Sequence, residues 1–147
     1  MGEAREIADL YLRAWEPLRG QVDDKLIADQ EVAAEEVEAW FRGGFELFAA
    51  SLDGTLAGVI RCSFPTGTCV IDRMAVEPDR SGSGVGRQLA EHAIARARRA
   101  GVTKVWAQAA PKLGDAVRLF RSLGFRESAQ LRASHWNEEV TLLELPL

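Results

Sequence analysis

The sequence has few of the features that mark secreted or membrane proteins. Only two of its 147 residues are cysteines, Cys62 and Cys69. Two are too few for a disulfide framework, and their spacing is not that of a zinc site, so we expect both to be reduced and buried. No apolar run approaches the roughly 20 residues that cross a bilayer, and the N-terminus lacks the segment order of a signal peptide. We therefore expect a soluble, cytoplasmic protein without a membrane partner.

Tyrosine and lysine are also scarce. Tyr11 is the only tyrosine, so the chain offers a single phenol as a general acid. No lysine lies between Lys25 and Lys104, which excludes from that segment a triphosphate-binding loop ending in Gly-Lys-Ser/Thr. No histidine has a partner at metal-ligand spacing, and we expect no metal. The acidic overall balance argues against nucleic acid as a partner.

The length and composition fit one globular domain over residues 1–147. Of these residues, 47% are hydrophobic and 27% are charged, with a net charge of -4. The charge is uneven, with a net of -9 over residues 1–79 and of +5 over residues 80–147. The acidic half would attract a cation and the basic half an anion, unless both are only solvated faces.

Hydrophobic periodicity predicts the element order ααβββαβαββ, an α+β (mixed α/β) domain. A polar, irregular connection is expected over residues 19–30, between the first two helices. The expected helices lie near residues 7–18, 33–42, 85–100 and 115–123. The expected strands lie near residues 45–51, 55–64, 68–76, 102–109, 125–131 and 140–145.

Three alternating glycines stand between an expected strand and an expected helix. Gly82, Gly84 and Gly86 let the backbone approach a ligand closely, and the free N–H groups of the first helical turn form an anion site. Phosphate is the expected ligand. The spacing G-x-G-x-G behind an antiparallel meander differs from the G-x-G-x-x-G of dinucleotide folds.

These residues resemble the GNAT superfamily of acyl-CoA-dependent N-acyltransferases. The family's pyrophosphate loop, Gln/Arg-x-x-Gly-x-Gly/Ala behind Val-x-Pro, is similar to residues 81–86 behind residues 76–78. The second family motif, Ala-x-x-Leu-Tyr-x-x-x-Gly-Phe, is similar to residues 116–125. The two motifs extend the resemblance over roughly residues 45–145.

The resemblance implies a central, mostly antiparallel sheet opened by a bulge at the fourth family strand. About four helices would flank the sheet, and the first family strand is expected to be missing because no strand precedes the first helix. Acetyl-CoA is the implied co-substrate. The implied cofactor-binding residues lie on one strand and the glycine loop: Met74, Ala75, Val76, Ser81, Gly82, Ser83, Gly84, Val85, Gly86 and Arg87.

Three positions depart from the family pattern. Ser81 stands where Gln or Arg is usual, so Arg80 or Arg87 is expected to supply the charge. Leu113 replaces a frequent cofactor-contacting Asn. Phe120 replaces the Tyr that in many members protonates the departing thiolate; it is not itself an acid, and we expect it to contact the cofactor.

An amine must be neutral to attack a thioester, which for a lysine-like amine at pH 7 costs about 4–5 kcal/mol. Asp72 is the candidate base or amine-binding residue, because the two-residue period places it on one strand face with Met74 and Val76. The alternative is a salt bridge with an arginine such as Arg61.

The acceptor is not fixed by any motif. A cationic small-molecule or peptide amine is suggested by acidic residues of the first half: Glu31, Glu35, Glu36, Glu38 and Asp72. Two functions stay open, an active N-acetyltransferase and a catalytically idle acyl-CoA-binding module, and a homodimer is also left open.

Overall fold

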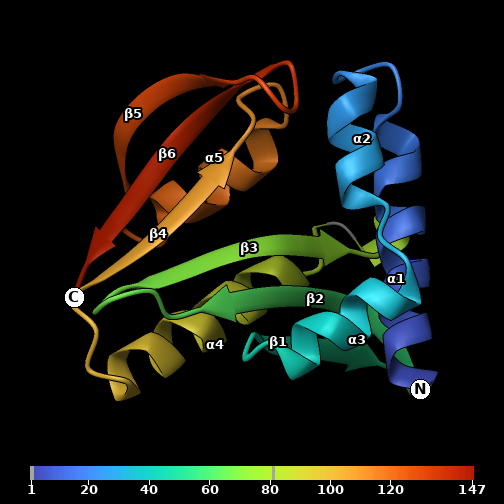
Figure 1. Ribbon diagram of the computed structural model, residues 1–147, viewed down its shortest axis with the longest axis horizontal. Coiled ribbons are helices and arrows are strands. Elements are labelled where there is room, and N and C mark those ends of the chain that lie inside the picture. Colours follow the sequence, from blue (N-terminus) through green and yellow to red (C-terminus); the bar gives the residue numbers. More distant parts are fainter. Residues whose placement is uncertain (1, 81) are drawn as a thin grey trace.

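A computed structural model describes residues 2–80 and 82–147, which form a six-stranded sheet with helices on both faces (Figure 1). No helix in this part of the chain is long and apolar enough to cross a membrane. The helices are α1 (Gly2–Trp15), α2 (Asp24–Gln30), α3 (Ala34–Arg42), α4 (Val85–Arg99) and α5 (Gly114–Ser122). The strands are β1 (Glu46–Leu52), β2 (Thr55–Ser63), β3 (Cys69–Val76), β4 (Lys104–Ala109), β5 (Arg126–Ala133) and β6 (Glu138–Pro146).

The sheet has the strand order β1-β2-β3-β4-β6-β5, and only β3 and β4 are parallel. These two strands pair at just two positions, Cys69 with Val105 and Val70 with Trp106. Beyond those pairs they diverge, with β4 rising away from β3 toward α2 (Figure 1). The divergence leaves one edge of β3 without a neighbouring strand and opens a wedge in the middle of the sheet.

A bulge in β3 accompanies the opening. The register between β2 and β3 shifts between Val59 and Arg61, and Arg73 has a φ of 53°. A non-glycine residue in this left-handed region is a feature of bulged strands. The expected bulge is thus present in β3. If the first family strand is missing ahead of α1, β3 corresponds to the fourth strand of the family.

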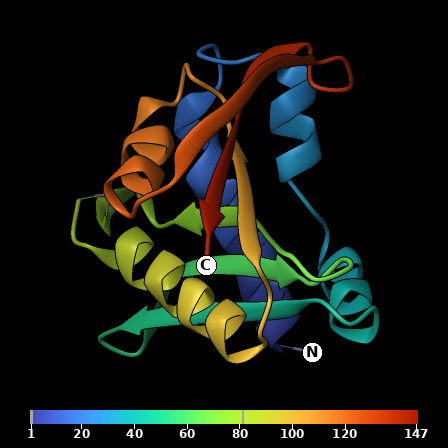
Figure 2. The same ribbon diagram turned by 90° about the vertical axis from the view of Figure 1, so that its left-hand side faces the viewer.

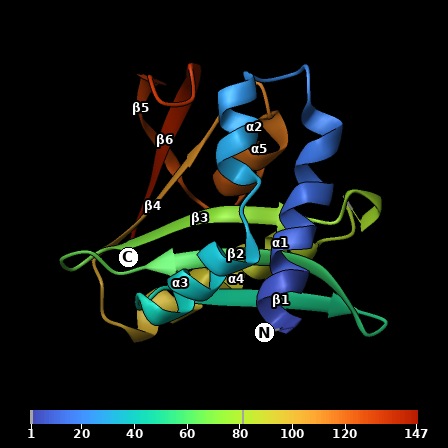
Figure 3. The ribbon, with the colours of Figure 1, turned by 45° about the vertical axis from the view of Figure 1, so that its right-hand side comes forward.

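Helices cover both faces of the sheet (Figures 2 and 3). α4 packs on one face, around Ile60, Ile71 and Leu89, and α1 and α3 pack on the other, around Val37 and Val59. Gly58 on β2 allows α4 to lie close, because a Cβ there would be 2.7 Å from Val85 Cγ1. The sheet is therefore the middle layer of three.

The expected elements are confirmed except for one helix. α2 lies in the segment expected to be irregular, which makes five helices where about four were expected. Asp23 caps α2 by accepting a hydrogen bond from Lys25 N at 2.9 Å. Cys62 and Cys69 are both free and buried, as expected.

Candidate cofactor and acceptor site

A groove of about 1340 Å³ occupies the wedge between β3 and β4. One of its ends is formed by the glycine loop and the first turn of α4, and the other by α2 and the β5–β6 connection. Its floor and sides are formed by the β3 segment from Ile71 to Val76, the end of β4 and the helix α5. One continuous groove therefore joins the expected anion site to the elements expected to bind an acceptor.

The glycine loop has the geometry of an anion site. Gly82 and Gly84 have φ values of 83° and 90°, which glycine adopts without steric cost. Gly84 is the N-cap of α4, and its carbonyl accepts from Gln88 N at 3.0 Å. The N–H groups before Gln88 in the first turn have no helical carbonyl to bind. They can therefore bind the oxygens of a phosphate.

Most of the expected cofactor residues of the loop line the groove, namely Gly82, Gly84, Val85, Gly86 and Arg87. Ser83 instead donates its hydroxyl to the carbonyl of Arg80. Ser81 lies outside the described residues. These five expected cofactor-binding residues thus lie together around one backbone turn.

Arginine side chains supply positive charge beside this turn. Arg80 and Arg87 both line the groove, and each keeps nearly half of its side chain exposed. Arg87 donates to Ser122 Oγ at 2.9 Å, which ties the start of α4 to the end of α5. Lys112, ahead of α5, and Arg118, within α5, also line the groove, and each contacts a carboxylate, Glu138 and Asp115 respectively. These cations fit a polyanionic ligand.

The strand wall is formed by Met74, Ala75 and Val76, which all line the groove. Gly86 faces this wall, since a Cβ at Gly86 would lie 3.6 Å from Val76 Cγ2 and 3.9 Å from Met74 Sδ. The β3 backbone here pairs with β2 on one side only, and its other edge faces the opening. An extended ligand with amide groups can bind this edge as an added strand.

Phe120 and Leu113 occupy the positions of the missing acid and amide. Phe120 is 4% exposed, lines the groove and contacts Phe125 with the ring centroids 5.2 Å apart. Leu113 lines the groove just ahead of α5. Tyr11 does not replace the missing acid: its hydroxyl is buried and donates to the carbonyl of Arg73.

Asp72 does not lie on the strand face where the two-residue period places it. Met74 and Val76 contact the core under α4, whereas Asp72 pairs with Arg61, which lies over Trp40 of α3. The bulge at Arg73 inserts one residue and reverses the alternation. The expectation that Asp72 shares a face with Met74 is therefore wrong, although Asp72 still lines the groove.

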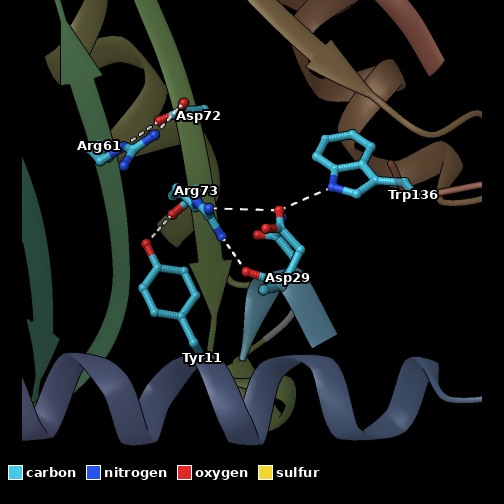
Figure 4. Close-up of polar contacts among 7 residues, drawn as sticks. Tyr11, Asp29, Arg61, Asp72, Arg73 and Trp136 are labelled. Atoms are coloured by element: carbon cyan, nitrogen blue, oxygen red, sulfur yellow. Dashed lines mark hydrogen bonds and ion pairs between the residues drawn. The ribbon is translucent and has the colours of Figure 1, made fainter. Parts of the chain in front are cut away.

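The alternative role of Asp72, a salt bridge, is present in the structure. Arg61 donates to Asp72 Oδ1 at 2.8 Å and to Oδ2 at 2.7 Å. The guanidinium of Arg61 is stacked between Phe45 and Trp40, at 4.2 and 4.6 Å from their ring centroids. Both carboxylate oxygens are thus held by a rigid, nearly buried partner (Figure 4).

Polar contacts join three elements at the acceptor end (Figure 4). Arg73 Nη1 donates to the carbonyl of Asp29 in α2 at 2.6 Å. Trp136, in the β5–β6 connection, donates from Nε1 to Asp29 Oδ2 at 3.0 Å. Around these contacts the groove is lined by apolar side chains: Trp15, Leu18, Leu26 and Trp136.

The acidic helix residues do not line this end of the groove. Glu31 is paired with Arg19, and Glu35, Glu36 and Glu38 belong to α3, outside the groove lining. The carboxylates in the lining each contact an arginine, namely Asp72 with Arg61, Asp29 with Arg73 and Asp115 with Arg118. Of the acidic residues expected to bind a cationic acceptor, only Asp72 therefore lines the described groove.

Sequence reasoning missed Asp29 and Arg73 as parts of the site. It considered Trp136 and its neighbours as a lining of the acceptor pocket but favoured a plain turn. Asp29 falls in the segment interpreted as irregular, and Arg73 stands out only through its backbone conformation. Trp136 lies in a turn between the last strands. Only the aromatic character of that turn signals a binding surface in the sequence.

Comparison with known proteins agrees with this geometry. The model of the acetyltransferase (GNAT) family matches residues 4–125. The [ribosomal protein bS18]-alanine N-acetyltransferase of Escherichia coli strain K12 is 28% identical over 105 residues, which cover 68% of this chain and 70% of that protein.

Solved structures show the same fold. The PaiA N-acetyltransferase of Thermoplasma acidophilum, solved with coenzyme A, superimposes with a TM-score of 0.79 at 13% identity and covers 99% of this chain and 94% of its own. The protein yncA of Salmonella typhimurium, solved with its cofactor acetyl-CoA, gives a TM-score of 0.69 at 25% identity, over 81% of this chain and 76% of its own. Since the family match runs from α1 to the start of β5, the chain belongs to the GNAT acetyltransferase family.

Proposed function

We propose that this chain transfers the acetyl group of acetyl-CoA to a primary amine. The observation that carries the proposal is the continuous groove from the N-terminus of α4, along the open edge of β3, to α2 and the β5–β6 connection. The pyrophosphate binds the first-turn N–H groups of α4. The pantetheine arm pairs with the backbone of Met74–Val76 as an added strand. The thioester then lies near Asp72 and the acceptor end.

The reaction is a direct acyl transfer. The neutral amine nitrogen attacks the thioester carbonyl carbon, the C–N bond forms, and the C–S bond breaks to release the coenzyme thiolate. The nitrogen loses one proton and the thiolate gains one. Because a thiol has a pKa near 8.5, the thiolate is an acceptable leaving group without a tyrosine donor, and water in the open groove protonates it.

We assign Asp72 to amine binding rather than to proton abstraction. Both of its oxygens already accept hydrogen bonds from Arg61, yet each keeps a lone pair that can accept from an ammonium group. The side chain is one-third exposed at the groove wall. The Asp72→Asn variant therefore raises KM for the amine more than it lowers kcat.

For the acceptor we propose the α-amine of a peptide. The relatives named as bS18-alanine N-acetyltransferases support this class. The lining of the acceptor end also supports this class. Its apolar side chains, Trp15, Leu26 and Trp136, can pack against an apolar group next to the amine of the substrate. A polycation would need several free carboxylates at once, whereas the three in the described groove lining each already contact an arginine.

A catalytically idle acyl-CoA-binding module is the second candidate. Phe120 and Leu113 favour it, since neither provides the acid or amide that these positions hold in many family members. Such a module binds acetyl-CoA in the same groove and releases no thiol with any amine. Binding and turnover therefore distinguish the two functions.

The test is release of coenzyme A thiol from acetyl-CoA with three kinds of acceptor: short peptides starting with alanine, the same peptides with a blocked N-terminus, and polyamines. We expect turnover with the free peptides alone. Turnover with polyamines alone would overturn the acceptor class. Binding of acetyl-CoA without turnover on any amine would identify the idle module, and no binding at millimolar concentration would reject the cofactor assignment.

We further propose that residues 1–147 act as one catalytic domain, because one sheet carries both ends of the groove. We also propose that this domain acts in the cytoplasm. Cell fractionation tests the location. Light scattering on the purified chain distinguishes a monomer from a homodimer.

A further inference from the structure

The bulge of β3 depends on Arg73, whose backbone lies in the left-handed region at a φ of 53°. Residues with a Cβ adopt this conformation at a cost in free energy, so neighbouring groups must stabilise it. The residues that follow it, Met74–Val76, form the strand wall of the groove. Whatever holds Arg73 therefore also sets the position of this edge.

The backbone of Arg73 is held from α1. The Tyr11 hydroxyl donates a hydrogen bond to the Arg73 carbonyl across the interface between α1 and β3 (Figure 4). Tyr11 is completely buried, and burial raises the pKa of its phenol, so the group stays protonated and remains a donor. Its ring packs against Trp40 at a centroid distance of 6.1 Å. Tyr11 thus fixes the direction in which the bulge carbonyl points.

The side chain of Arg73 is held from the acceptor end. It donates to the Asp29 carbonyl at 2.6 Å and lies 3.6 Å from the Asp29 carboxylate. That same carboxylate accepts from Trp136 Nε1. The Arg73 side chain is only 14% exposed, which limits its rotation and keeps these contacts in place.

The connection between β5 and β6 is joined to α2 at a second point. Asn137 donates to Asp23 Oδ2 at 2.8 Å, and Asp23 N donates to the buried Glu138 at 2.6 Å. These bonds link α2 and this connection into one unit. Arg73 is the residue through which that unit contacts the strand wall.

We propose that Tyr11, Asp29 and Trp136 are positioning residues that act through Arg73, so that the acceptor-side elements hold the β3 edge in the form that binds the cofactor. This inference rests on the proposed function for the identity of the cofactor. On this proposal the same contacts hold the bulge in the free protein. Tyr11 and Asp29 affect cofactor affinity without contributing a reactive group.

The main test compares Tyr11→Phe with the wild-type chain. The variant keeps the buried ring and removes only the hydroxyl. We expect coenzyme A to bind roughly 2- to 10-fold more weakly, the range that corresponds to one lost hydrogen bond. We also expect the amide NMR shifts of Met74, Ala75 and Val76 to change in the free protein.

A second variant and a matched control separate positioning from general stability. Trp136→Phe removes the indole N–H at the acceptor end, and we expect a weaker effect on the same three amides. Arg13→Gln breaks another polar link between α1 and the end of β3, the ion pair of Arg13 with Glu77 at 2.8 Å. We expect this control to lower the unfolding midpoint but to leave coenzyme A affinity within twofold.

Unchanged coenzyme A affinity and unchanged amide shifts in Tyr11→Phe would overturn the positioning proposal. Equal loss of affinity in Arg13→Gln and Tyr11→Phe would overturn it as well, because docking of α1 alone would then explain the effect. If the wild-type chain binds no coenzyme A, the proposed function fails. The amide shifts of the free variants still decide whether Tyr11 and Trp136 position the edge.

Discussion

At the scale of single residues, a substitution at Gly86 is expected to stabilise the fold and to weaken cofactor binding. It lies in the first turn of α4 with ordinary backbone angles, and a methyl group there would touch Val76 and Leu119 at 3.6 Å without a clash. Gly86→Ala is expected to raise the free energy of unfolding by about 0.5–1 kcal/mol. It should also raise KM for acetyl-CoA roughly tenfold, because the methyl group fills the groove beside the strand wall. Urea unfolding and initial rates measure the two effects.

The control for this prediction is Gly84→Ala. Its φ of 90° is unfavourable for alanine, so we expect a loss of about 1–2 kcal/mol in stability together with weaker binding. A less stable Gly86→Ala would contradict the stability prediction, and an unchanged KM would show that Gly86 does not face the cofactor.

Phe120 provides a second prediction at this scale. The ring is 4% exposed and lines the groove. Because the family motif has a proton-donating Tyr at this position, we expect the hydroxyl added in Phe120→Tyr to reach the departing thiolate. We expect kcat to rise, by up to about 100-fold if protonation of the thiolate limits the rate. The measurement is kcat between pH 6 and pH 9. An unchanged kcat at every pH would show that the lack of a donor does not limit turnover.

The sequence allowed the glycine loop to be located residue by residue, because its spacing is a local property of the chain. It did not allow the face of Asp72 to be predicted. The alternation rule holds only in a regular strand, and the left-handed Arg73 that breaks it has no marker such as glycine or asparagine. The Arg61 partner of Asp72 was foreseen as an alternative, since opposite charges on neighbouring strands tend to pair.

At the scale of elements, α2 depends on a cap that titrates. The pKa of Asp23 is lowered by the hydrogen bond from Lys25 N and then by Asn137. A lowered pKa means that its stabilising effect is fully present above the ordinary value of 3.8 and is lost as the pH falls below it. We therefore expect the wild-type chain to lose stability relative to Asp23→Asn between pH 5 and pH 2.5.

Urea unfolding of both chains across this range measures the difference. Asparagine also caps helices but does not titrate. A constant difference between the two chains at all pH values would contradict the role of the Asp23 carboxylate in holding α2.

Long elements with a clear period could be predicted from the sequence, and α2 could not. α1 and α4 repeat their buried residues at helical spacing over 14 and 15 residues. α2 has seven residues, and of its three buried residues, Leu26, Ile27 and Gln30, the last is polar, so the segment shows no hydrophobic period. Its stability comes from packing against Ala110 and Trp136, which are distant in sequence. Isolated helices of this length are not stable.

At the scale of the whole molecule, folding redistributes the charge that the sequence separates into halves. The described groove lining has six arginine or lysine side chains and three aspartates. Arg61 and Arg73 come from the acidic half of the sequence. Cationic side chains therefore outnumber carboxylates in this lining, although the chain has a net charge of -4 and Arg80, Arg87 and Lys112 each contact a carboxylate outside the lining.

This excess predicts a salt-dependent affinity. Raising the ionic strength from 0.05 to 0.5 M should weaken coenzyme A binding roughly 3- to 10-fold, because salt screens the exposed Arg80 and Arg87 from the phosphates. Pantetheine lacks the phosphates and serves as the control ligand, with an affinity that stays constant. Calorimetry at several salt concentrations checks both. Equal salt effects on the two ligands would argue against phosphate binding at the loop.

The two-pair contact between β3 and β4 also has a consequence for the order of folding. The β1–β2–β3 meander and the β5–β6 hairpin pair strands that are neighbours along the chain, and closing short loops loses little entropy. The contact between β3 and β4 instead closes a long crossover through α4. We expect it to form after the transition state, so that truncating the buried Val105 to alanine speeds unfolding and leaves the folding rate nearly unchanged. The wedge that holds the cofactor would then be the last part of the sheet to form.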